Sequence, residues 1–226
     1  MLILSLDTTT SFGSVALMRG TELLSEINMK GPLTHSESLL PAIQFLLKSK
    51  RLNIKDVDGY ALSVGPGSFT GIRIGLSTVK SFSWASGKPI APVSTLEALA
   101  LKLGDSQRRL MAPLLDAKKG EIYGALFESR GKKLKEVVPQ GAYSPDRFFS
   151  LLPAHRIIHF IGSGVEAYKD KIFHYFKDKA RISSRSHFIA YEIGLLGYGI
   201  FKKGEGKDFL KIEPLYFRKS QAEERD

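Results

Sequence analysis

One stretch of this 226-residue chain decides its fold: Ser63-Val64-Gly65-Pro66-Gly67-Ser68-Phe69-Thr70-Gly71-Ile72-Arg73-Ile74-Gly75. It joins an apolar strand to a helix through a glycine-rich turn, yet it matches neither common nucleotide-binding motif. A P-loop needs a lysine directly after its last glycine, where this chain has Ile72. A dinucleotide-binding turn that starts at Gly65 needs its third glycine where this chain has Thr70. The glycines of this stretch therefore serve another purpose.

Three of these glycines, Gly67, Gly71 and Gly75, recur every four residues and leave one helix face without side chains. Such a face either lets a second polypeptide approach closely or eases the contact of the helix with its own sheet. A glycine inside a helix costs about 1 kcal/mol relative to alanine, so the recurrence needs a packing reason. The sequence leaves both interpretations open.

The composition is that of a globular, basic chain. Its hydrophobic share is 43% and its charged share is 25%, and no apolar run reaches the roughly 18 residues of a membrane span. The absence of cysteine excludes disulfides and thiolate metal sites, and it fits a reducing cytoplasm. A net charge of +10 favours anionic partners such as RNA, a nucleotide or an acidic protein. The basic residues are nevertheless dispersed, without the interleaved aromatic residues of a base-stacking surface.

Hydrophobic periodicity predicts the order βββαβαβα, followed by a second half that restarts in the same way. The first strand closes on Asp7, and the first strand of the second half closes on Asp116. Thr34 and Glu37 form a capping box at the start of a helix that contains Pro41, where we expect a kink. The predicted class is α/β, with two similar lobes of mixed sheets flanked by helices, residues 1–104 and 105–226. A hairpin-first duplicated lobe indicates the ribonuclease-H-like architecture of actin-like proteins.

Polar strand ends provide one candidate site for a phosphate-bearing ligand. Its residues are Asp7, Thr9, Asp116, Gly162 and Gly164. Small hydroxyls and backbone amides can cradle phosphates, and an acid can hold Mg²⁺ through water. Ordinary strand-end turns have the same composition, and the turn after Asp116 carries two lysines where a phosphate loop is built from glycines. We therefore favour turns over a cofactor site.

Two further kinds of chemistry are disfavoured. His155 and His159 lie in a predicted strand without an accompanying acid, so the ligand set of a metallohydrolase is missing. Ser68 follows a strand-to-helix turn as an esterase nucleophile does, but Pro66 and Thr70 replace the glycines of that motif.

Six segments together resemble the TsaB (YeaZ) family of accessory subunits in tRNA threonylcarbamoyladenosine synthesis. They are Ile3–Thr10, His35–Pro41, Val64–Gly75, Ala91–Ala100, Leu114–Tyr123 and Pro214–Arg218. The Gly-Pro-Gly-Ser-Phe-Thr-Gly block is the most specific of them, and the match is looser between residues 132 and 209.

The resemblance implies an actin-like (ASKHA) fold and a subunit that does not itself transfer the threonylcarbamoyl group. In the family, such a chain pairs with the paralogous transferase TsaD, the ATPase TsaE joins them, and tRNA binds through the complex. The family contact uses the first two helices of each partner, and we assign the partner interface here to His35, Leu39, Leu40, Ile43, Phe69, Gly71, Ile72, Gly75, Leu76 and Val79.

The resemblance further implies no cofactor bound by this chain alone, with ATP or ADP at the partner interface as the exception. A homodimer in isolation and a cytoplasmic location are also expected. Two alternatives stay open from the residues: a small ATP-dependent kinase or ATPase that uses Asp7 and Asp116 around Mg²⁺, and an RNA-binding module.

Overall fold

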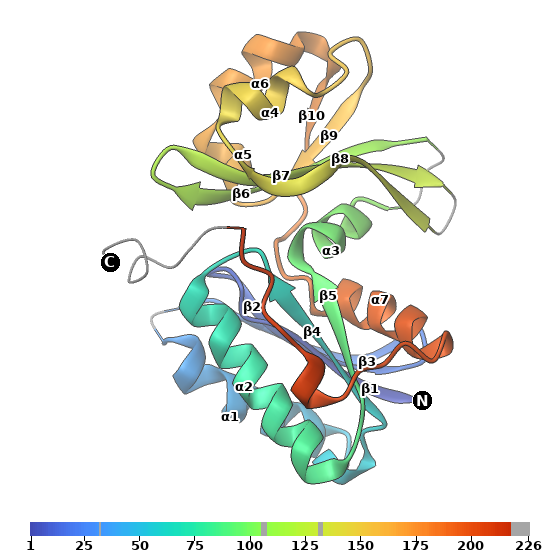
Figure 1. Cartoon of the computed structure of the whole chain (residues 1–226). Helices are drawn as coiled ribbons and strands as arrows, with labels where there is room; N and C mark the ends of the chain where they lie inside the picture. The colour runs from blue at the N-terminus through green and yellow to red at the C-terminus, as the bar shows by residue number, and fades with distance from the viewer. Residues whose placement is uncertain (32, 105–107, 131–132, 218–226) are drawn as a thin grey trace. The chain divides into compact units, whose positions relative to one another are not determined.

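The computed structural model describes residues 1–31, 33–104, 108–130 and 133–217, which form two compact units. The first unit combines Met1–Thr95 with Phe188–Leu215, and the second holds Leu96–His187 together with Tyr216 and Phe217 (Figure 1). Each unit contains one five-stranded sheet among the described residues. Within these residues, no helix combines the length and apolar character needed to cross a bilayer.

The sheet of the first unit has the strand order β3-β2-β1-β4-β5. β1, β2 and β3 pair antiparallel, whereas β4 and β5 continue the sheet in parallel beside β1. The elements of this unit are β1 (Leu2–Asp7), β2 (Gly13–Arg19), β3 (Glu22–Met29), α1 (His35–Ser49), η1 (Ile54–Asp56), β4 (Gly59–Gly65), α2 (Phe69–Ser86), β5 (Ile90–Ser94), α7 (Ala190–Lys202) and η3 (Phe209–Lys211).

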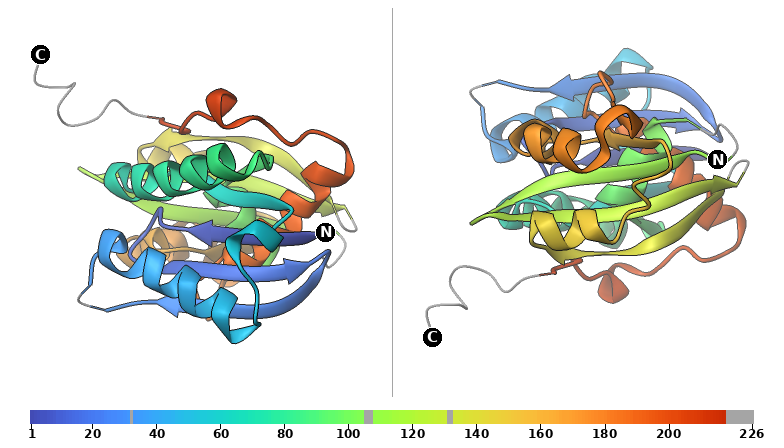
Figure 2. Two further views of the ribbon diagram at one scale, coloured as in Figure 1. Left: turned by 90° about the horizontal axis from the view of Figure 1, so that it is seen from below. Right: turned by 90° about the horizontal axis from the view of Figure 1, so that it is seen from above.

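Alternating residues of β1 serve two different cores. Leu4 and Leu6 join the cluster that contains the buried residues of α1 and α2, whereas Ser5 faces α7 and donates to Ala190 O at 2.7 Å. α1 and α2 lie next to one another along the sheet in the views of Figures 1 and 2. Both sequences form helices here because each buries an apolar stripe in the core. Burial of that stripe stabilises a helix more than its intrinsic helix propensity does.

The first turns of α1 and α2 are capped by side chains, and the cap of α1 is the capping box that the sequence predicts. Glu37 Oε2 accepts from Thr34 N at 2.8 Å, and this hydrogen bonding lowers the pKa of Glu37. Ser68 Oγ accepts from Gly71 N at 3.3 Å at the start of α2. α2 ends at Gly87, whose φ of 68° is the left-handed conformation that favours glycine. α1 runs through Pro41 without interruption from His35 to Ser49.

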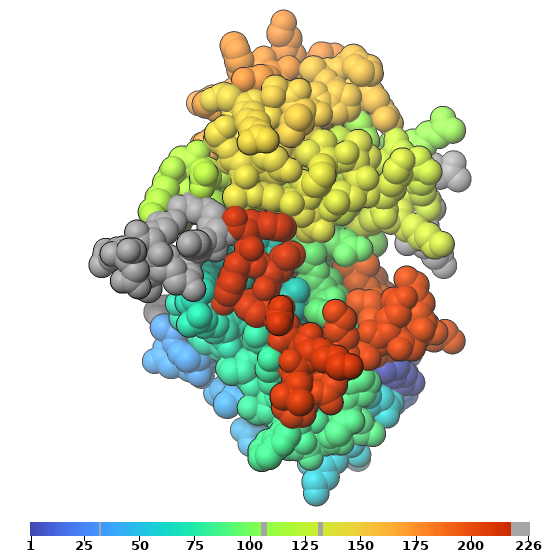
Figure 3. Space-filling model, viewed as in Figure 1, coloured from blue at the N-terminus to red at the C-terminus, as the bar shows by residue number. Residues whose placement is uncertain are grey.

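The segment after α7 crosses the surface of the first unit as a strap, shown in red in Figure 3. Lys207 pairs with Ile90 at the edge of the sheet, η3 contacts α2, and Leu215 N donates to Val64 O at 2.7 Å. The strap thereby covers the side of α2 that faces away from α1.

The second unit repeats the topology of the first. Its strand order is β8-β7-β6-β9-β10, so β6 takes the central position that β1 has in the first unit. Its elements are α3 (Thr95–Lys102), which begins with the last residue of the first unit, and β6 (Leu110–Lys118), β7 (Glu121–Arg130), β8 (Lys133–Tyr143), α4 (Pro145–Ser150), β9 (Ile158–Ile161), α5 (Gly164–Ala167), α6 (Lys169–Phe176), η2 (Lys177–Lys179) and β10 (Ala180–Ile182).

The structure changes the expected bounds of the two lobes. The lobes are not 1–104 and 105–226, because residues 188–215 return to the first unit, where α7 packs on β1, β2, β4 and β5. Distant segments of sequence can share one core, which local pattern does not reveal. Two expected features reach beyond the described residues: the lobe boundary after residue 104, and the last matched segment, which ends at Arg218.

The glycines of α2 face this chain's own backbone, which decides between the two interpretations of the sequence. A Cβ at Gly71 would overlap Thr8 O, and one at Gly75 would come within 2.5 Å of Thr8 Oγ1. A Cβ at Gly67 would overlap Thr9 O. The idea that these glycines receive a foreign polypeptide is therefore wrong; they let α2 start directly against the loop after β1.

We expect Gly71→Ala to lower the free energy of unfolding by about 1–3 kcal/mol, because the added methyl must push α2 away from Thr8. Gly199→Ala in α7 is the matched control, since a Cβ there meets nothing within 4 Å and should stabilise the helix by up to about 1 kcal/mol. Urea denaturation measures both. A Gly71→Ala protein as stable as the parent would contradict this account of the packing.

Candidate functional site

A buried carboxylate lies where β1 ends. Asp7 is 0% exposed, and its Oδ1 accepts hydrogen bonds from Thr9 N at 3.0 Å and from Thr9 Oγ1 at 2.7 Å. Thr95 Oγ1 donates to Thr9 Oγ1 at 3.2 Å and lies 2.6 Å from Ser63 Oγ. The acid thus sits beneath a chain of hydroxyls that links β1, β4 and the start of α3.

The other oxygen of this acid, Asp7 Oδ2, is buried and has no hydrogen-bond partner. Burial raises the pKa of Asp7 to about 6, against the opposing effect of the hydrogen bonds from Thr9 and the nearby charge of His35. An unpaired buried oxygen is costly when the carboxylate is charged. The folded protein therefore binds a proton at Asp7 more tightly than the unfolded chain does.

Asp7 and Thr9, two residues of the predicted phosphate site, are enclosed in the structure. Both residues are buried, and the start of α2 packs directly on the loop through Gly67 and Gly71. In this structure Asp7 is therefore closed to solvent.

The matching acid of the second unit is arranged differently. Asp116 accepts from Lys118 N and Lys118 Nζ, both at 2.8 Å. Partial burial would raise the pKa of Asp116, but the hydrogen bonds and charge of Lys118 lower it below its ordinary value. The flanking glycines again approach backbone: a Cβ at Gly162 would overlap Leu114 O, and one at Gly164 would lie 3.0 Å from the carbonyl carbon of Leu115.

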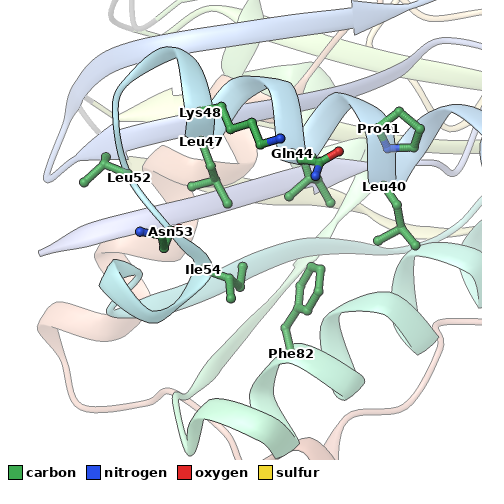
Figure 4. A pocket seen from close by; sticks show the side chains of 10 residues that line it. Leu40, Pro41, Gln44, Leu47, Lys48, Leu52, Asn53, Ile54 and Phe82 are labelled. Atoms are coloured by element: carbon green, nitrogen blue, oxygen red, sulfur yellow. The ribbon is translucent and has the colours of Figure 1, made fainter.

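An open apolar groove of about 500 Å³ runs between α1 and α2. α1 contributes Leu40, Gln44 and Leu47, the turn after α1 contributes Leu52 and Ile54, and α2 contributes Phe82 (Figure 4). Leu40 is 53% exposed, although a leucine of this size gains roughly 1.5–3 kcal/mol from full burial. The groove is an open apolar surface suited to receive a partner.

The residues predicted for the partner interface fall into three groups in the structure. Leu40 and Ile43 line the groove. His35 and Phe69 are half-buried at the starts of the two helices. The remaining predicted residues are buried in this chain's own fold and do not lie at its surface: Leu39, Gly71, Ile72, Gly75, Leu76 and Val79.

Sequence reasoning missed Gln44, Leu52, Ile54 and Phe82. Leu40, Gln44 and Leu47 follow the spacing i, i+4 and i+7 on the side of α1 next to its buried stripe, which was a detectable signal. No local pattern points to Leu52 or Phe82, because they meet α1 through tertiary packing.

The described residues contain no cluster of three or more histidine, aspartate or glutamate side chains that could hold a metal ion. His159 is partly buried, and its pKa is lowered by desolvation and by Arg109 and Arg181. Ser68 caps α2 with its hydroxyl, which places it in a structural role.

The fold and these sites define a two-lobed protein of the actin-like class, with a sealed acid and an open helix-pair groove in its first unit. The fold resembles a ROK hexokinase from Thermus thermophilus, with a TM-score of 0.52 at 12% identity over 90% of this chain and the whole of that one. A family model described as TsaD, tRNA N6-adenosine threonylcarbamoyltransferase, matches residues 32–193.

Curated relatives and a solved structure specify the family. The chain is 30% identical to the tRNA threonylcarbamoyladenosine biosynthesis protein TsaB of Bacillus subtilis over 99% of this chain and 96% of that protein. It is 30% identical to the protein of the same name from Haemophilus influenzae over 74% of this chain and 73% of that protein.

A crystal structure from Pseudomonas aeruginosa, described as an uncharacterized protein with similarity to peptidase YEAZ, has a TM-score of 0.83. It is 26% identical over 96% of this chain and 99% of that one. The chain belongs to the TsaB family.

We expect Asp7→Asn to remove a pH dependence of stability. Because the folded pKa of about 6 lies above the ordinary value of 3.8 for an aspartate, the protonated acid favours folding at low pH. This contribution, about 3 kcal/mol, is lost as the pH rises from roughly 4 through 6. Asn cannot ionise, so the difference in unfolding free energy between variant and parent should grow over this range in favour of the variant. Chemical denaturation at several pH values tests it; a difference that stays constant with pH would contradict a raised pKa.

Proposed function

We propose that this chain is a non-catalytic subunit that binds a TsaD-like paralogue through the groove between α1 and α2 and supports threonylcarbamoylation of tRNA. The open groove, with Leu40 at its rim, is the observation that carries the proposal. Membership of the TsaB family and the match to the TsaD model support the choice of a paralogous partner. A stable interface buries about 1,600 Å² in total, which two adjacent helices can largely supply.

The sealed acid supports a role without nucleotide chemistry of its own in the first unit. Asp7 is enclosed by its own chain, which disfavours the alternative of an independent kinase or ATPase. ATP or ADP at the contact with the partner, and participation of a TsaE-like ATPase, are parts of the same proposal. The net charge of +10 supports contact of the complex with tRNA, and the lack of cysteine is compatible with a role in the cytoplasm.

Reconstitution tests the function. Purified TsaD-like and TsaE-like proteins, tRNA and threonylcarbamoyl-adenylate are incubated with and without this chain, and modified adenosine is measured. We expect modification to depend on the chain. Equal modification in its absence would refute the accessory role.

Leu40→Glu tests the groove. A charge buried in the contact should weaken binding of the TsaD-like partner by about tenfold or more, or at least 1.4 kcal/mol. Phe45→Glu is the matched control: Phe45 is 69% exposed on the same helix, but it lies about 140° around the axis from Leu40 at about 3.6 residues per turn.

Calorimetric titration with each variant gives the affinities, and light scattering of the chain alone shows whether a second copy occupies the groove as a homodimer. The proposal fails if Leu40→Glu binds as the parent does, or if both variants lose affinity equally.

A further inference from the structure

Both helices of the groove are fixed at their first turns to one short loop, residues 8–11, which follows β1. His35 Nε2 of α1 donates to Thr10 O at 2.6 Å. At the start of α2, Ser68 N donates to Thr9 O at 2.7 Å. Thr8 Oγ1 donates to Gly71 O, also at 2.7 Å. The loop therefore contacts both helices at their N-terminal ends.

The carboxylate of Asp7 fixes the conformation of this loop through hydrogen bonds from Thr9. Its Oδ1 accepts from both the backbone and the hydroxyl of Thr9, and Thr9 is held from the other side by Thr95. The loop cannot move independently of α2, because Gly67 and Gly71 let the backbone at the start of α2 pack directly on Thr8 and Thr9. A change in the loop must consequently move the first turn of α2.

We propose that Asp7 is a positioning residue for the partner: through Thr9 it holds the loop that fixes α1 and α2 relative to one another, and so it sets the width of the groove. The proposal rests on the proposed function, in which the partner docks in that groove. The groove walls, Leu40 on α1 and Phe82 on α2, belong to different helices, so a rotation of either helix about its first turn separates them. The acid acts at a distance, by hydrogen bonds, without touching the partner.

A second buried residue of β1 distinguishes a positioning role of Asp7 from a role in stability alone. Ser5 is equally buried in β1 and donates to Ala190 O of α7 at 2.7 Å, on the face of the sheet opposite the groove. Ser5→Ala removes a buried hydrogen bond from the same strand. It should therefore lower the stability of the protein while α1 and α2 keep their hydrogen bonds to the loop. It is the matched control.

The test compares the full-length chain with Asp7→Ala, Asp7→Asn, Thr8→Val and Ser5→Ala, each at a temperature where it is folded. Affinity for the TsaD-like partner is measured by calorimetry, and amide hydrogen exchange is measured in the free chain. We expect Asp7→Ala and Thr8→Val to weaken binding at least fivefold, whereas Asp7→Asn, which keeps an acceptor for Thr9, and Ser5→Ala bind within twofold of the parent. In free Asp7→Ala and Thr8→Val, exchange should rise at least fivefold in the first turns of α1 and α2 but not in α7.

The outcomes separate the two proposals. If the parent binds but Asp7→Ala and Thr8→Val bind equally well, the positioning role is wrong and the docking function stands. If the parent does not bind, the docking function fails, and hydrogen exchange still decides whether the loop holds both helices. Exchange that is unchanged in α1 and α2, or that rises equally in α7, overturns the positioning role. Should Asp7→Ala fail to fold, Thr8→Val carries both measurements.

Discussion

The first unit depends on a contact between two backbones, where the start of α2 rests on the loop after β1 with no side chain between them. Gly67 and Gly71 make this possible, since any Cβ at either position would overlap a carbonyl oxygen of the loop. Close packing of this kind is rigid, because neither backbone can yield without moving a whole element. It closes the strand end above Asp7, and it fixes where α2 begins. The apolar sides of α1 and α2 are then left open to one another as a groove.

The second unit uses the same construction with a different result. Gly162 and Gly164 bring the start of α5 against the end of β6, as Gly67 and Gly71 bring α2 against the loop after β1. The acid at the strand end differs: Asp116 is partly exposed and paired with Lys118, whereas Asp7 is enclosed. A duplicated fold can thus keep its backbone contacts while the two strand-end acids acquire separate environments.

Much of the fold follows from local sequence, and the site follows from it only in part. The order βββαβαβα and the capping box at Thr34 are encoded within a few residues, and the structure confirms them. The return of α7 to the first sheet depends on contacts between distant segments, so periodicity could not predict it.

The spacing of four residues between the glycines at α2 indicates that another backbone approaches this helix closely. It does not say which backbone, because a foreign chain and this chain's own loop both require a residue without a side chain. The apolar stripe of α2 carries the same ambiguity: its spacing is compatible with a partner surface, but Ile72 and Val79 are core residues. The exposed wall of the groove required the tertiary placement of Phe82 beside α1.

The central claim is that a paralogous partner occupies the groove between α1 and α2. The most direct measurement is the pattern of amide hydrogen exchange in this chain with and without a saturating TsaD-like partner. The account predicts slowed exchange over residues 40–54 and around Phe82, with α7 and the second sheet unchanged. Protection confined to α7 or to the second unit, with residues 40–54 exchanging as in the free chain, would contradict it.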